Sequence, residues 1–123
     1  MVKLDQKETE TLRSVVGAVV DRLALPGDVK GDLWKEVSRN TDLILQELKC
    51  REQHVLRAIS SFQEREINYR RSADNRNFNP AMQNNLRQTA DDAAANGKLL
   101  LQELWRRQAL YDKVRWHGLP EDL

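Results

Sequence analysis

The sequence predicts an all-α protein, and three observations lead to this prediction. Charged residues make up 32% of the chain and aromatic residues only 6%, a balance typical of long helices. Only five glycines and three prolines occur, so the chain has few turns. Apolar residues recur at spacings of three and four over most of its length. We expect a single domain over residues 1–123, in which a short N-terminal helix packs on a long antiparallel helical hairpin.

The first helix is predicted over residues 6–24. Asp5 and Glu8 have the spacing of a capping box, in which each residue bonds the backbone of the other. An apolar stripe follows, made of Leu12, Val15, Val16, Val19, Val20 and Leu23. Pro26-Gly27 then interrupts the periodicity, which predicts a turn.

The second helix is predicted over residues 28–71, where neither Pro nor Gly interrupts the chain after Asp32. Its apolar residues are Leu33, Trp34, Val37, Ile44, Leu48, Val55, Ile59 and Phe62. At 1.5 Å per residue this helix is roughly 60 Å long, which predicts a coiled-coil-like arm.

The third helix is predicted over residues 80–117, after a loop at 72–79. Asn79 can cap the helix, Pro80 suits its first position, and Gly118 ends it. If the chain folds back symmetrically about Asn75, Leu48 faces Leu104 and the arm has one apolar seam.

Charge and motifs argue against several classes of function. The net charge is only +1, and the arginines predicted at the tip of the hairpin are diluted by acidic neighbours, so we do not expect nucleic-acid binding. No apolar run long enough for a membrane span and no signal peptide occur, and a single cysteine fits the reducing cytoplasm. Cys50 and His54 are only two potential metal ligands, so we expect no metal, no cofactor and no enzyme activity.

The stretch 98–116 predicts a protein-binding surface. Apolar side chains cover more than half of its helical circumference, and tryptophans stand beside arginines, a composition typical of binding hot spots. We therefore expect a helical surface that binds a protein partner through Leu100, Leu104, Trp105, Tyr111, Val114 and Trp116.

The run Asn96-Gly97-Lys98-Leu99-Leu100, followed by Gln108 and Leu110, resembles a signature in the last helix of FlgN-type flagellar export chaperones. The earlier layout is also similar, with a first helix, a Gly27-Asp28 step and then a long helix. The resemblance implies a cytoplasmic bacterial chaperone that holds hook–filament junction subunits before type III export. It further implies that the C-terminal helical region engages an amphipathic segment of the client, on Leu100, Leu104, Tyr111 and Val114.

Two alternatives remain open at this point. The chain is either such a chaperone or a structural subunit of a coiled-coil complex, including a homodimer or larger helical bundle. A nucleic-acid-binding hairpin is the weakest hypothesis, and it requires binding that falls steeply with salt.

Overall fold

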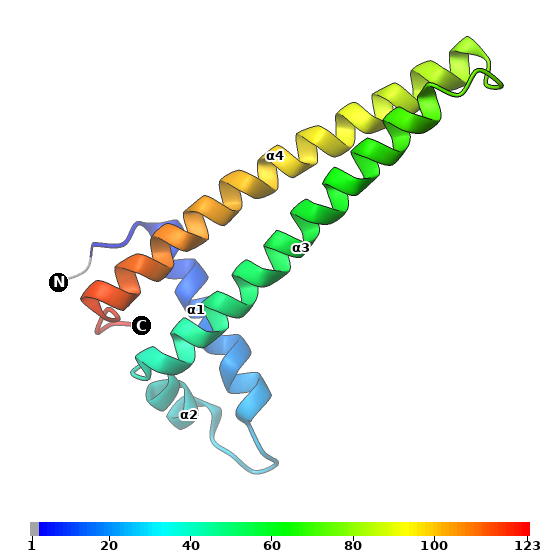
Figure 1. Cartoon of the computed structure of the whole chain (residues 1–123). Helices are drawn as coiled ribbons and strands as arrows, with labels where there is room; N and C mark the ends of the chain where they lie inside the picture. The colour runs from blue at the N-terminus through cyan, green and yellow to red at the C-terminus, as the bar shows by residue number, and fades with distance from the viewer. Residues whose placement is uncertain (1–2) are drawn as a thin grey trace. The chain divides into compact units, whose positions relative to one another are not determined.

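The computed structural model describes residues 3–123 and contains four helices in that range (Figure 1). They are α1 (Gln6–Leu23), α2 (Lys30–Val37), α3 (Thr41–Ala73) and α4 (Pro80–His117). No strand occurs within residues 3–123, so the prediction of an all-α fold is confirmed. The predicted number of helices, three, is wrong by one. Within the same range, no helix is long and apolar enough to cross a membrane.

The start of α1 is the predicted capping box. The Glu8 backbone N–H donates to Asp5 Oδ1 at 2.7 Å, and the Asp5 N–H donates to Glu8 Oε1 at 3.3 Å. Two N–H groups that the helix cannot bond internally are thereby satisfied. Leu23 is the last helical residue, and the chain turns at Gly27, whose φ of 92° is in the left-handed region that favours glycine.

The helix predicted over 28–71 is two helices, because Ser38–Asn40 forms a break that contains neither Pro nor Gly. The Asn40 N–H donates to the Val37 carbonyl at 3.0 Å, a three-residue turn that ends α2. The Asn40 side chain then accepts from the Leu43 N–H at 3.2 Å and caps α3. Short polar side chains thus compete for the backbone groups that a continuous helix would need. The break allows α2 to pack closely on α1.

Both ends of α4 follow the prediction. Asn79 Oδ1 accepts from the Met82 N–H at 2.8 Å, and Pro80 is the first helical residue. At the other end Gly118 has a φ of 78° and its N–H donates to the Val114 carbonyl at 2.8 Å. A glycine after the last helical residue is a common way to satisfy the final carbonyls.

The chain divides into two compact units, which we describe separately. The first unit comprises the chain up to Glu52 together with Arg107–Leu123, and the second unit is Gln53–Arg106. The core of the first unit consists of aliphatic side chains from α1, α2, α3 and α4, namely Leu12, Val15, Val16, Val19, Val20, Val37, Ile44, Leu48, Leu110 and Val114. An ion pair between the buried Glu8 carboxylate and the partly exposed Lys113 ammonium, with Nζ–Oε1 at 2.8 Å, joins α1 to α4 in this unit.

The second unit is a pair of helices with a small core. Val55 and Ile59 from α3 and Leu104 from α4 are buried together, and Leu100 packs against them. Ala90 and Ala93 are also buried, which places small side chains of α4 in the interior of the pair. So few buried side chains leave the two helices with much apolar surface still exposed.

The predicted register of the hairpin is wrong by about two helical turns. Leu104 is buried with Val55, and Arg70 on α3 reaches Asp91 on α4 at 3.0 Å. The cause is the loop at 74–79, which does not fold back symmetrically. Its Asn75 carbonyl accepts from the Gln83 side-chain amide at 3.1 Å, so the first turn of α4 lies beside the loop rather than beside α3.

Candidate partner-binding surface

Two of the six predicted partner-binding residues belong to the core of the second unit or pack on it. Leu104 is only 5% exposed, and Leu100 packs against the same cluster. A side chain that is buried in the seam between two helices offers a partner almost no surface. The prediction that Leu104 binds a client directly would therefore require the pair of helices to open.

Two further predicted residues are part of the first unit. Val114 is completely buried in its core, and Tyr111 packs against that core with the Lys49 ammonium 5.2 Å from the centre of its ring. In the first unit, the apolar stripe of α4 that was predicted to bind a partner is thus covered by α1, α2 and α3 of the same chain. Sequence periodicity shows that a helix has an apolar stripe but does not show what covers it.

The two predicted tryptophans are exposed, as a partner site requires. Trp105 in the second unit is 59% exposed and Trp116 in the first unit is 74% exposed. Trp116 has the Arg115 guanidinium 5.6 Å from its ring centre, within range of a cation–π contact. Trp105 lies one turn after Leu101, which lines a groove in the second unit, and this makes Trp105 the stronger candidate.

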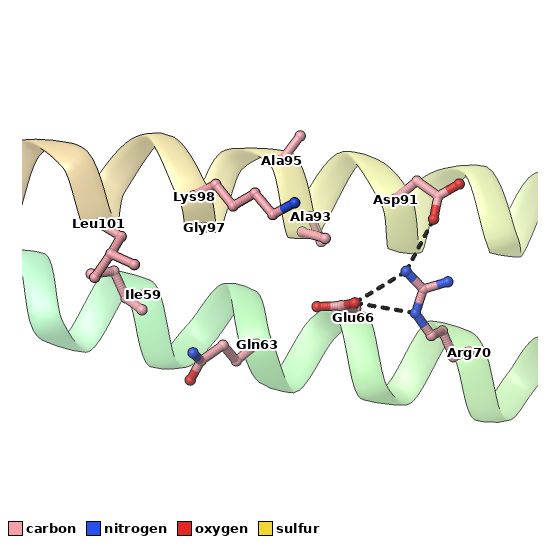
Figure 2. A pocket seen from close by; sticks show the side chains of 11 residues that line it. Ile59, Gln63, Glu66, Arg70, Asp91, Ala93, Ala95, Gly97, Lys98 and Leu101 are labelled. Carbon is pink, nitrogen blue, oxygen red and sulfur yellow. Dashed lines mark hydrogen bonds and ion pairs between the residues drawn. The ribbon is translucent and has the colours of Figure 1, made fainter.

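This groove lies between α3 and α4 of the second unit and has a volume of about 580 Å³ (Figure 2). Small residues of α4 form part of its lining, namely Ala93, Ala94, Ala95 and Gly97. A Cβ added to Gly97 would lie 3.9 Å from Phe62 Cβ, an ordinary contact, so the two helices approach each other closely here.

One end of the groove is apolar. Ile59 on α3 and Leu101 on α4 line it, and Figure 2 shows Leu101 reaching from α4 towards Ile59. Leu56 lies one turn before Ile59 and Trp105 one turn after Leu101, so helical geometry extends the apolar surface along both helices. Both Leu56, at 40%, and Leu101, at 36%, are exposed. We call this surface, the groove with Leu56 and Trp105, the groove face.

The other end of the groove is charged. The Arg70 guanidinium donates to Glu66 Oε1 and to Asp91 Oδ1, each at 3.0 Å, as the dashed lines in Figure 2 show. The hydrogen bonds to Asp91 and then Glu66 raise the pKa of Arg70. One cation therefore faces two anions. Lys98 also lines the groove, and it forms no ion pair with the residues at 3–123.

Sequence reasoning missed Leu56, Ile67 and Leu101 as surface residues. Ile67 is 51% exposed and lies one turn after Gln63, which lines the groove, so it continues the same face of α3. The available signal was a second apolar stripe, beside the seam, on each helix. Leu101 and Trp105 form that stripe on α4, one turn apart.

The segment between α1 and α2 carries a separate set of exposed apolar side chains. Leu25 is 70% exposed and Val29 is 66% exposed, and the Asp28 side chain accepts from the Leu25 N–H at 2.7 Å. These side chains lie on a short connecting segment rather than along a groove. They give a partner less continuous surface than the groove face does.

The described residues offer no arrangement for metal chemistry. Within 3–123 no three His, Cys, Asp or Glu side chains come together in a way that could hold a metal ion. The groove face itself is an apolar strip beside paired charges.

Comparison of the chain with protein-family models, with curated proteins and with solved structures gave no match.

Proposed function

We propose that this chain is a non-catalytic helical interaction protein that binds an amphipathic helix of a client protein on its groove face. The observation that supports this proposal is the exposure of Leu56, Leu101 and Trp105 beside one groove. Large apolar side chains on one face of a helix pair cost free energy in water, at roughly 25 cal/mol for each Å². A partner that covers them recovers that free energy.

A helix suits the groove better than an extended peptide does. Docking of an extended chain depends on a free sheet edge that can supply backbone hydrogen bonds, whereas residues 3–123 contain no strand. An amphipathic helix needs only apolar anchors at spacings of three and four, and these can enter between Ile59 and Leu101. Trp105, an exposed aromatic side chain beside these anchors, would supply the largest contact.

The resemblance of residues 96–100 to FlgN-type chaperones supplies the client class. Gly97 and Lys98 of that run line the groove, and Leu100 packs beneath it. We therefore propose a cytoplasmic export chaperone whose client is a hook–filament junction subunit. In this proposal Leu101 and Trp105 replace Leu104 and Val114 as the residues that contact the client, since the latter two are buried.

A nucleic-acid site at the tip has less support. Arg70, one of the arginines in that region, is already bonded to Glu66 and Asp91. A guanidinium held by two carboxylates must exchange them before it can bind phosphate.

The test uses synthetic peptides that match the C-terminal amphipathic segments of hook–filament junction subunits. Binding is measured by titration calorimetry against the wild-type chain, Leu101→Asp and Leu99→Asp. Leu99 is a matched control because it is exposed on the same helix, but two residues before Leu101 and so on the opposite face. We expect Leu101→Asp to weaken binding at least tenfold and Leu99→Asp to leave it unchanged.

Two results would contradict the proposal. If none of these peptides binds, the client class is wrong. If a peptide binds and the two variants weaken it equally, the groove face is not the binding surface.

A further inference from the structure

The side of the second unit that carries the groove face is larger than one client helix can cover. Gln53–Ala73, the part of α3 within the second unit, is about 30 Å long, and two helices side by side are about 20 Å wide. This side of the helix pair, with the groove face on it, therefore offers about 600 Å² of area. A single helix about 10 Å wide covers roughly half of it. A second hairpin of the same dimensions covers all of it.

The area shows which class of interface such an association could form. Two copies meeting over this face would bury about 1,200 Å² in total, the lower limit for specific protein interfaces. An interface of this size is weak and exchanges readily, in contrast to the large apolar interfaces of permanent dimers. The face is thus sufficient for a reversible dimer.

The apolar residues favour one orientation of two copies. In a two-fold dimer whose axis runs along the hairpin, α3 of one copy lies over α4 of the other and both tips point the same way. Residues at the same level along the hairpin then meet. Leu56 of one copy meets Leu101 and Trp105 of the other, so exposed apolar surface covers exposed apolar surface.

The charges favour the same orientation. At the other end of the groove the cation, Arg70, is on α3 and Asp91 is on α4. When α3 lies over α4 of a second copy, each Arg70 lies near the Asp91 of its partner as well as its own, and the Lys98 of each copy balances the charge of Glu66. The reverse orientation would place this charged end over the apolar end, which leaves charges desolvated without partners.

From these observations we infer that a second copy of this chain covers the groove face when no client is bound, with α3 of each copy over α4 of the other. The dimer follows from the groove face alone. Its consequence, that a client must displace the second copy, rests on the proposed function.

Sedimentation velocity across about 2 to 200 µM tests the dimer, because a Kd on the order of 10 µM falls within that range. We expect the wild-type chain and Leu99→Asp to shift from monomer to dimer with concentration. Leu101→Asp and a second variant, Trp105→Ser, should stay monomeric, with unchanged far-ultraviolet circular dichroism. A wild-type chain that is monomeric throughout refutes the inference, as does a dimer that Leu101→Asp leaves intact.

Two further measurements test the orientation. Arg70→Glu and Asp91→Arg should each weaken the dimer about tenfold, and the double variant should recover most of the loss. Spin labels at position 77, placed by Asn77→Cys with Cys50→Ser, should lie about 20 Å apart, roughly two helix diameters. Labels separated by the length of the second unit, about 30 Å or more, would show the reverse orientation and refute the inference.

Client peptide separates this inference from the proposed function. Peptide added to the dimer should convert it into a complex of one chain and one peptide. A monomeric chain that binds the peptide would retain the proposed function and refute the dimer. A dimer that binds none of the peptides would support the dimer and refute the proposed function.

Discussion

The ion pair between Glu8 and Lys113 allows a quantitative test of how the first unit is held together. The Lys113 ammonium lies 2.8 Å from Glu8 Oε1 and 2.9 Å from Oε2, and the Glu8 side chain is 7% exposed. Replacing Lys113 by Met would leave a buried carboxylate without its cation. Breaking a fully buried pair costs about 3–5 kcal/mol, and an exposed pair is worth less than about 1 kcal/mol.

The partial exposure of Lys113 places the expected cost between these limits. Its side chain is 42% exposed, so water can replace part of the lost interaction. We expect Lys113→Met to lower the free energy of unfolding by about 2 kcal/mol. Glu8→Gln, which keeps an acceptor for the Asp5 N–H, should cost about 1 kcal/mol. The double variant should cost less than the sum, because it leaves no charge unpaired.

Urea unfolding, followed by far-ultraviolet circular dichroism, measures these changes. Arg106→Ala is the control, because its ion pair with Glu103 is exposed and 3.5 Å long, and it should change stability by less than about 0.5 kcal/mol. If Lys113→Met costs no more than the control, or if the two single effects simply add, this pair does not hold α1 to α4 as we describe.

Three further predictions concern single residues of the fold, each measured by urea or thermal unfolding. Asn79→Ala should cost about 1 kcal/mol by removing the cap of α4, whereas Asn79→Asp should keep most of that stability; equal losses in both would contradict the capping role. Gly97→Ala should stabilise the chain by about 1 kcal/mol, because alanine favours a helix over glycine and the added Cβ would lie at an ordinary distance, 3.9 Å, from Phe62 Cβ. A loss of stability would mean that α3 and α4 are closer at this position than that distance implies. Ile44→Ala should cost about 2–5 kcal/mol because Ile44 is completely buried, and a change below 1 kcal/mol would place it outside the core.

The ends of the helices could be predicted from the sequence because their signals are local. Asp5 with Glu8, Asn79 with Pro80, and Gly118 act within a few residues of their own positions. The break at Ser38–Asn40 is equally local, but it contains neither Pro nor Gly, the two residues that interrupt helices most strongly. Asn40, a good capping residue, marked that break in the sequence.

The register of the hairpin could not be predicted in the same way. It depends on the path of the loop at 74–79, where Gln83 bonds Asn75 and displaces the start of α4 by about two turns relative to a symmetrical turn. A narrow seam with several alanines does not specify register strongly, because small side chains accept many neighbours.

The residues predicted for the candidate site all lie on α4, and the structure buries several of them. Tyr111 and Val114 pack in the first unit and Leu104 in the second, whereas Trp105 remains exposed. A helix with apolar side chains on most of its circumference does not reveal which side its own chain will cover. Leu101 becomes a candidate only when Ile59 is seen across the groove.

The fluorescence of Trp105 tests most directly the claim that the groove face is an interaction surface. In the variant Trp34→Phe with Trp116→Phe, Trp105 is the one tryptophan left in the chain. We predict that its emission shifts to shorter wavelength when client peptide binds, and also when concentration drives the chain to dimer. Peptide binding or dimerisation that leaves Trp105 emission at its solvent-exposed position would contradict the account.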